Sequence, residues 1–141
     1  MNNPSAPKVT VEATVQAPIE KVWTYWTEPV HIMKWSYATE EWHVPKAEND
    51  LREGGAFLNR MEAKDGSMGF DFDGVYDTVK PHQEITYTLG DGRKVEILFE
   101  DQGGVTKVVQ TFEAEATHAV EMQQQGWQAI MNHFKQYTEQ A

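Results

Sequence analysis

The chain contains no cysteine, which excludes disulfide scaffolds, thiolate metal sites and cysteine nucleophiles. It has no run of the roughly 18 apolar residues that a membrane-spanning helix needs. Its first residues, MNNPSAPK, also lack the apolar stretch of a signal peptide.

Basic residues are scarce: 12 Lys and Arg stand against 22 Asp and Glu, giving a net charge of −10. That negative charge opposes binding to nucleic acids and to anionic membranes, because both would repel the protein. We therefore expect a cytoplasmic protein that neither binds nucleic acid nor inserts into a membrane.

The histidines do not have the spacing of a metal site. No two of them lie three or four residues apart, and no acidic residue completes a recognised ligand pattern. The five are His31, His43, His82, His118 and His133. The sequence thus predicts no metal ion and no cofactor.

The periodicity of apolar residues changes along the chain. Alternation from Val9 to Val15 predicts a strand with one buried face. Pro18 then stands where a helix would begin, followed by an apolar stripe at helical spacing that includes Trp23 and Trp26. Pro29 ends this helix and opens a second short one over residues 30–34.

From about residue 39 to 115 the period falls to two. This predicts strands near 40–45, 55–63, 68–79, 84–89, 93–100 and 105–114. Asp65-Gly66 and Asp91-Gly92 are hairpin signals, so neighbouring strands should pair antiparallel. A long helix follows, with Thr117 as its expected N-cap and an apolar stripe from Val120 to Tyr137. A sheet of this size curls, and only this helix is long enough to cover its apolar face.

This order of elements resembles the helix-grip fold of the START-like (SRPBCC) superfamily, which includes the birch-pollen allergen, polyketide cyclases and lipid-transfer domains. The resemblance is closest to its branch of heat shock protein 90 ATPase activator homologues. It covers nearly the whole chain, through the segments APIEKVWTYWTEPVHIMKW, DLREGGAF, FDGVYDTVKPHQEITYT and GWQAIMNHF. It implies one α+β domain over residues 1–141, with its core at about 8–139 and residues 1–7 flexible. A curved antiparallel sheet of about seven strands would wrap around the C-terminal helix, with two short helices between the first and second strands.

Two departures from the family pattern lie near the expected mouth of a cavity. Members often have a doubled Trp near the second short helix, whereas Ser36 follows Trp35 here. Glu53 occupies a position that is more often apolar.

Gly74, which shares the parity of Phe72 and Tyr76, indicates a kink or bulge where the sheet bends. Gly126 is expected to allow a close backbone approach to the long helix.

Parity and helical spacing together predict the residues that line the cavity. Each of them, taken alone, also fits an ordinary filled core. Three are polar residues on otherwise apolar faces, and burying each without a partner costs roughly 1–3 kcal/mol. An apolar pocket with a few convergent polar groups is the usual form of a small-molecule site. The predicted lining is Trp35, Trp42, Phe57, Asn59, Met61, Phe70, Phe72, Tyr76, Tyr87, Ile97, Val108, Gln110, Phe112, Gln123, Trp127, Ile130, Met131 and Phe134.

Three functions follow as hypotheses. The first is a carrier or sensor, with a stress-related role as one option, that binds a hydrophobic, aromatic small molecule in the cavity. The second is a polyketide cyclase- or hydrolase-like enzyme using the same cavity, although no catalytic pair can be identified from the sequence. The third, implied by the resemblance alone, is a co-chaperone-like module that acts on a heat shock protein 90 type ATPase.

Overall fold

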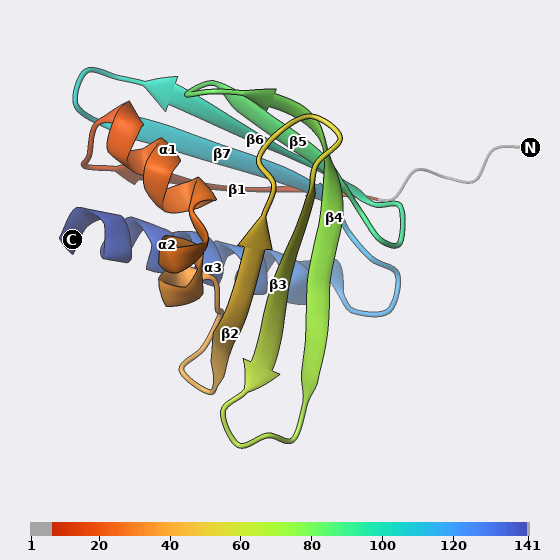
Figure 1. The fold of residues 1–141 in the computed structure, drawn as a ribbon. Helices are drawn as coiled ribbons and strands as arrows, with labels where there is room; N and C mark the ends of the chain where they lie inside the picture. The colour runs from red at the N-terminus through yellow and green to blue at the C-terminus, as the bar shows by residue number, and fades with distance from the viewer. Residues whose placement is uncertain (1–6, 141) are drawn as a thin grey trace, which may run out of the picture.

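The computed structural model describes residues 7–140, and Figure 1 gives their arrangement. The predicted flexibility of residues 1–7 falls almost wholly outside this range and stays untested. The elements, in chain order, are β1 (Lys8–Val15), α1 (Ile19–Thr27), α2 (Pro29–Trp35), β2 (Trp42–Asn49), β3 (Ala56–Ala63), β4 (Gly69–Lys80), β5 (Glu84–Leu89), β6 (Lys94–Asp101), β7 (Thr106–Glu113) and α3 (Val120–Gln140).

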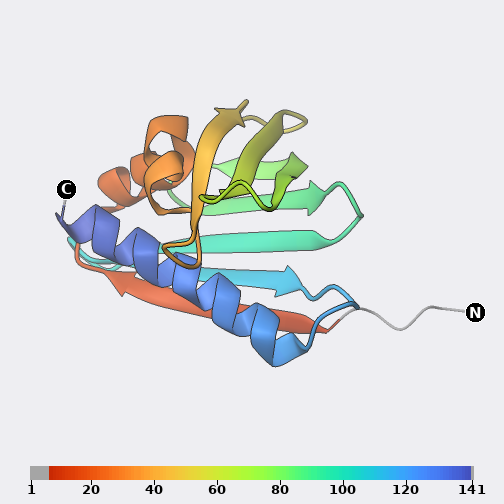
Figure 2. The same cartoon turned by 90° about the horizontal axis from the view of Figure 1, so that it is seen from below.

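The strands form one seven-stranded sheet in the order β1-β7-β6-β5-β4-β3-β2, and every neighbouring pair is antiparallel. The sheet is strongly curved, and α3 runs across its concave side (Figures 1 and 2). The two short helices close one end. This confirms the predicted α+β helix-grip fold.

The concave face carries the core because alternate residues of each strand point inward. Cross-strand registers place the inward residues in rows. Tyr76 faces Tyr87, and Val95 lies between Tyr87 and Phe112. In the neighbouring row Ile97 lies between Ile85 and Gln110. The predicted parity of these strands is therefore correct.

Hydrogen bonds fasten α3 along β1. The Gln128 Nε2 donates to the carbonyl oxygen of Glu12 (3.0 Å), and the Lys135 Nζ donates to the carbonyl oxygen of Thr14 (2.9 Å). Near the C-terminus the Glu139 carboxylate accepts the backbone N–H of Gln16 (2.8 Å). The helix thus lies over one side of the concave face. The other side, formed by β3–β5, depends on α1 and α2 for its cover.

Gly74 allows a close approach within the sheet. A Cβ atom at this position would lie 2.6 Å from the carbonyl oxygen of Thr88 and 2.9 Å from the Phe57 ring. The irregularity in β4 is nearby but not at the glycine itself, because the register with β5 shifts between Tyr76 and Thr78. Gly74 therefore makes room for an aromatic ring. The bulge between Tyr76 and Thr78 is the feature that bends the sheet.

Three local predictions are wrong. The α3 helix begins at Val120, so Thr117 is not its N-cap; the side chain of Gln123 instead bonds back to the segment 115–118 that precedes the helix. Gly126 has nothing within 4 Å of an added Cβ, so no close backbone approach occurs there. Strand β2 continues to Asn49 instead of ending near residue 45.

No helix within residues 7–140 has both the length and the apolar character required to cross a membrane.

Candidate functional site

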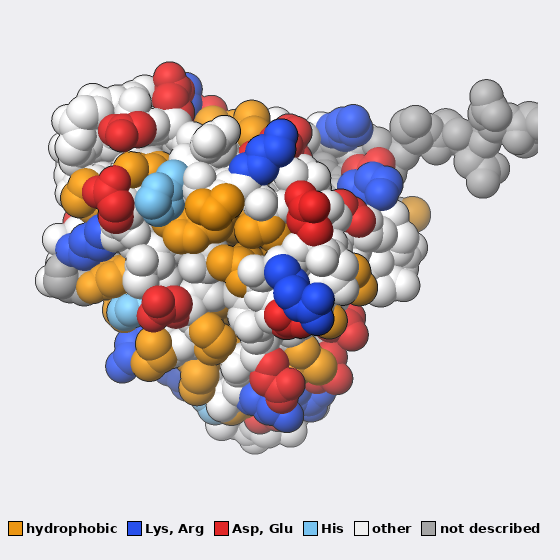
Figure 3. Space-filling model, turned by 45° about the horizontal axis from the view of Figure 1, so that its top comes forward, with side chains coloured by type: hydrophobic (Ala, Val, Ile, Leu, Met, Phe, Trp, Pro, Cys, Tyr) orange, Lys and Arg blue, Asp and Glu red, His pale blue; other side chains and the backbone are white. Residues whose placement is uncertain are grey.

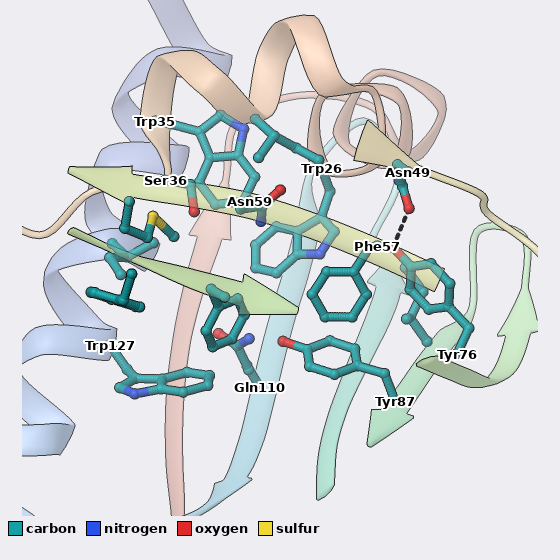
Figure 4. A pocket seen from close by; sticks show the side chains of 16 residues that line it. Trp26, Trp35, Ser36, Asn49, Phe57, Asn59, Tyr76, Tyr87, Gln110 and Trp127 are labelled. Atoms are coloured by element: carbon teal, nitrogen blue, oxygen red, sulfur yellow. Dashed lines mark hydrogen bonds between the residues drawn. The ribbon is translucent and has the colours of Figure 1, made fainter. Parts of the chain in front are cut away.

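A pocket of about 210 Å³ lies between the concave face of the sheet and the helices (Figure 4). It is formed where α3 does not cover the sheet, under β3, β4 and β5. Sixteen residues line it: Trp26, Ile32, Trp35, Ser36, Asn49, Phe57, Asn59, Met61, Phe70, Phe72, Tyr76, Ile85, Tyr87, Gln110, Trp127 and Ile130.

The two short helices provide the roof. Trp26 and Trp35 project from α1 and α2, with their ring centroids 4.9 Å apart, and both rings pack edge-on against Phe134 of α3 (4.8 Å each). The Trp35 indole is fixed because its Nε1 donates to the backbone oxygen of Tyr25 (2.9 Å). The roof is therefore a rigid aromatic surface anchored on α3.

Aromatic rings from the sheet form one wall. The Phe57 ring lies 4.7 Å from that of Tyr87 and 5.3 Å from that of Tyr76. On the helix side, the Trp127 ring stacks on that of Phe112 at 3.9 Å with an interplanar angle of 10°, and it makes a T-shaped contact with the Phe72 ring at 6.1 Å. Trp127 thus has the predicted inward orientation, and Phe112 supports its ring from below.

The pocket opens between the β3–β4 hairpin and α3. Phe70, near the start of β4, is 51% exposed, and Met61 opposite it on β3 is half-buried. Trp127 and Ile130 of α3 are also half-buried. The residues on the far side, such as Ile85 and Tyr87, are buried. A molecule entering here would pass apolar side chains first.

Two tyrosines provide polar atoms inside the pocket. The Tyr76 hydroxyl donates to the Asn49 Oδ1 (2.5 Å), and the Asn49 amide nitrogen in turn donates to the backbone oxygen of Thr27. Burial raises the pKa of Tyr76 well above its ordinary value, and the hydrogen bond with Asn49 only partly offsets this. Burial, together with the neighbouring Tyr76, likewise raises the pKa of Tyr87. Both hydroxyls therefore stay protonated at neutral pH.

None of the sixteen lining residues carries a charged side chain at neutral pH. Within residues 7–140, no three His, Asp or Glu side chains come close enough together to hold a metal ion. The pocket is therefore a neutral, mostly aromatic cavity with a few polar groups.

A second hollow of about 510 Å³ surrounds Gly74 and includes outward-facing residues such as Leu58 and Asp73. It is larger than the concave pocket, but Val75 in its lining is 46% exposed, so it opens broadly to solvent. Small-molecule sites bury most of the ligand's surface. The smaller, concave pocket is for this reason the candidate site.

The structure brings most of the predicted cavity residues together around the pocket. These are Trp35, Phe57, Asn59, Met61, Phe70, Phe72, Tyr76, Tyr87, Gln110, Trp127 and Ile130. The sequence predicted this grouping because residues of equal parity on a curved sheet converge on its concave side.

The remaining predicted residues lie elsewhere. Most of them fill the core where α3 packs closely on the sheet, and these are Ile97, Val108, Phe112, Met131 and Phe134. Trp42 lies outside the lining, with its ring 5.9 Å from that of Phe70. Gln123 does not face the pocket, because its side chain bonds to the backbone of Glu115 and His118.

Five lining residues were absent from the predicted set: Trp26, Ile32, Ser36, Asn49 and Ile85. Trp26 was placed on the apolar stripe of α1, but nothing in the sequence indicates that this stripe faces a cavity. Asn49 belongs to a part of β2 that the periodicity did not reveal. Ile85 has the inward parity of Tyr87 and was detectable from the alternation of β5.

The chain is similar to several solved structures. The AHSA1-like protein from Aeromonas hydrophila is 40% identical, with 95% of this chain and 93% of that one covered and a TM-score of 0.89. A protein from Cytophaga hutchinsonii is 61% identical, with 94% and 92% covered and a TM-score of 0.83. A protein from Chromobacterium violaceum, at 22% identity, shares the fold with a TM-score of 0.85 over 94% of this chain and 98% of that one. No curated protein matches the chain significantly.

Residues 16–139 match the family described as "Activator of Hsp90 ATPase homolog 1-like protein". The matched range includes both short helices, strands β2–β7 and nearly all of α3, and hence every residue that lines the pocket. The family match and the helix-grip architecture therefore agree along the chain, and we conclude that this protein belongs to the Activator of Hsp90 ATPase homolog 1-like family and has a START-like fold.

Proposed function

We propose that this protein binds a small, hydrophobic, aromatic molecule in the concave pocket and acts as its carrier or sensor. The observation that carries the proposal is the arrangement of rings from Trp26, Phe57 and Trp127 around a space with no charged side chain. Aromatic rings prefer offset-stacked or edge-to-face neighbours at 4.5–7 Å, and these walls offer both kinds of contact to a flat ligand.

The volume limits the size of the ligand. A cavity of roughly 150 Å³ is enough to hold benzene, and this pocket measures about 210 Å³. We therefore expect one ring or two fused rings to fit without rearrangement. Flavonoid-like molecules and fatty acids should require the β3–β4 hairpin to move away from α3, and should bind more weakly.

Two alternatives use other features of the same molecule. An enzyme of the cyclase or hydrolase type would have to rely on the hydroxyls of Tyr76 and Tyr87, the titratable groups of the lining. Turnover of a bound ligand would favour it. A co-chaperone role rests on the family's name and on the acidic composition. Acidic and basic side chains alternate on the face in Figure 3, however, and do not gather into one acidic region there.

The test is a titration with naphthalene, a flavonoid-like molecule and a fatty acid, monitored by melting temperature and indole fluorescence. Binding to the folded state raises stability by about 2.7 kcal/mol when the free ligand is 100-fold above its Kd. We expect naphthalene to raise the melting temperature most. The proposal is wrong if no member of the panel shifts it, and the aromatic preference is wrong if only the fatty acid does.

Two tryptophan variants locate the binding event. Trp127 lines the pocket, whereas Trp23 packs outside it against Phe99 (5.2 Å) and His82 (5.9 Å). Trp127→Phe should keep the fold and lose a clear part of the ligand-dependent fluorescence change; Trp26 and Trp35 account for the rest. Trp23→Phe is the matched control and should retain the full change. Equal responses of the two variants would place the ligand elsewhere.

A further inference from the structure

Three largely buried residues direct polar side chains into the pocket, and two of these side chains have no hydrogen-bond partner in the described part of the protein. Asn59 is 9% exposed, Ser36 is 8% exposed and Gln110 is 7% exposed, and all three line the cavity. Across residues 7–140, neither the Asn59 amide nor the Ser36 hydroxyl has a hydrogen bond to the protein. Gln110 has only the neighbouring Tyr87 hydroxyl. Figure 4 shows the three side chains directed into the space between the labelled rings.

These groups differ from the other polar residues of the lining. Asn49 and Tyr76 satisfy each other, and Asn49 also reaches the backbone of Thr27, so this pair holds β2, β4 and α1 together. Asn59 and Ser36 hold no element in place. Among the described residues only the Thr138 Oγ1 is a fully buried side-chain polar atom without a partner, so the unbonded polar atoms of Asn59 and Ser36 are accessible from the pocket. Their free atoms are therefore available to a molecule in the pocket.

The electrostatics of the pocket select the kind of group that these atoms can bind. No Lys or Arg lines the pocket to pair with a carboxylate, and both tyrosines remain neutral. An ion moved into such a site loses its hydration without gaining a counter-charge. The chain's net charge of −10 opposes an anion further. The polar part of the ligand should therefore be uncharged.

A carboxamide side chain both donates and accepts hydrogen bonds, and a hydroxyl does the same. The best complement to Asn59, Gln110 and Ser36 is thus a neutral group that also has both functions. We infer that these three residues form a hydrogen-bonding subsite for a carboxamide or lactam group on a small aromatic ligand. This inference rests on the proposed function and specifies the class of ligand that the pocket selects.

The experiment compares naphthalene, 2-naphthamide and 2-naphthoate at neutral pH. All three have the same ring system, so they differ in the polar group alone. We expect 2-naphthamide to bind the wild-type protein at least tenfold more tightly than naphthalene, and 2-naphthoate to bind more weakly than 2-naphthamide. Calorimetry or the fluorescence change gives the dissociation constants.

Asn59→Leu replaces the amide by an apolar group of similar size. It should reduce the preference for 2-naphthamide over naphthalene by about tenfold, which is the size expected for the loss of one neutral hydrogen bond. Ser36→Ala should weaken 2-naphthamide by a smaller factor. Ser67→Ala makes the same change at the β3–β4 turn, where the Ser67 hydroxyl bonds Asp65, and should have no effect. Circular dichroism checks that each variant is folded.

The outcomes separate the two proposals. Equal affinity of naphthalene and 2-naphthamide, unchanged in Asn59→Leu, would mean that water satisfies the three polar groups; the subsite is then wrong and the proposed function stands. Tighter binding of 2-naphthoate than of 2-naphthamide would also overturn the subsite. If neither naphthalene nor 2-naphthamide binds, both proposals are wrong. Should Asn59→Leu fail to fold, Ser36→Ala and Gln110→Leu test the same loss of selectivity.

Discussion

Thr106 and Thr138 are both fully buried, but their hydroxyls have different surroundings. The Thr106 hydroxyl donates to the carbonyl oxygen of Ala17 at 2.9 Å. The Thr138 Oγ1, on the buried side of α3, has no hydrogen-bond partner among the residues that the structure describes. A buried hydroxyl without a partner costs roughly 1–3 kcal/mol, whereas one that is bonded contributes about 1 kcal/mol.

The first prediction is therefore that replacing threonine by valine changes the free energy of unfolding in opposite directions at these two positions. Thr138→Val should raise the free energy of unfolding by about 1 kcal/mol or more, because the isosteric methyl group removes an unsatisfied polar atom. Thr106→Val should lower it by a similar amount, since the Ala17 oxygen is left unpaired. Denaturant unfolding of the two variants measures both. A loss of stability in Thr138→Val would mean that its hydroxyl bonds an internal water.

Phe112 illustrates why a side chain's direction does not reveal what it contacts. It was predicted to line the cavity, and it does point toward the concave side. It is 1% exposed, however, and the space above it is filled by the stacked Trp127 ring. Shortening it would leave a void in a filled core, for which ring removal typically costs about 3–5 kcal/mol.

At the scale of elements, the glycines of β4 and α3 have opposite roles. Gly74 lies between Phe57 of β3 and Leu89 of β5, and an added Cβ would be only 2.9 Å from the Phe57 ring and 2.6 Å from the Thr88 carbonyl oxygen. Gly126, in the first half of α3, has open space around it. One glycine makes room for the Phe57 ring in the pocket wall, and the other is only a weak helix former.

The second prediction compares Gly74→Ala with Gly126→Ala. Gly126→Ala should stabilise the protein by about 0.5–1 kcal/mol, because alanine loses less backbone entropy in a helix. Gly74→Ala should destabilise it and also weaken naphthalene binding, since the Phe57 ring must move to make room. Thermal unfolding and ligand titration of both variants provide the measurements. Unchanged stability and binding in Gly74→Ala would contradict the close packing at this point of the sheet.

The position of α3 explains where the pocket lies. The helix is hydrogen-bonded along β1 by Gln128, Lys135 and Glu139, and its Trp127 stacks on Phe112 of β7, so it fills the concave side near β1 and β7. The sheet curls away from it at β3–β5. Trp26 and Trp35 cover that part but do not reach the inward residues of the strands completely. The pocket is the space that remains between α3, which is fixed along β1, and the part of the sheet that curls away from it at β3–β5.

For the whole molecule, the buried tyrosines make stability depend on alkaline pH. Burial raises the pKa of Tyr76 and Tyr87 in the folded protein, whereas in the unfolded chain both have the ordinary value near 10. The unfolded state therefore loses its tyrosine protons first as the pH rises. The free energy of unfolding should be unaffected by these groups below about pH 9 and should fall steeply above about pH 10.

The third prediction is that Tyr87→Phe reduces this alkaline fall. The variant keeps the ring but removes one of the two pocket tyrosines whose folded pKa burial raises, so its stability should decline less between pH 10 and the pH of unfolding. Free energies from urea unfolding at pH 7 to 11 give the comparison. Tyr25→Phe is the control, because it makes the same substitution at a half-buried tyrosine outside the pocket. Parallel curves for wild type and Tyr87→Phe would show that the buried hydroxyl does not control the transition.

The sequence by itself determined the elements, their order and the face that each presents. Alternation of apolar residues is a local property, so Val9 to Val15 or Phe57 to Met61 reveal which side of a strand is buried before any partner is known. The glycine-containing turns then required antiparallel neighbours, and one long amphipathic helix was left to cover the sheet. The family resemblance agreed with this order at every element.

Only the tertiary structure decided which inward residues face a cavity and which face other atoms. Phe112 and Phe72 have the same inward orientation, but one lies under Trp127 and the other borders the pocket, because α3 is fastened nearer to β1 than to β4. Ser36 and Asn49 enter the lining only because the loop after α2 and the end of β2 fold over the curved sheet. Periodicity gives the direction of a side chain. Whether that side chain meets another side chain or an open space depends on how far the sheet curls and where α3 is held. Residues distant in sequence determine both the curvature of the sheet and the position of the helix.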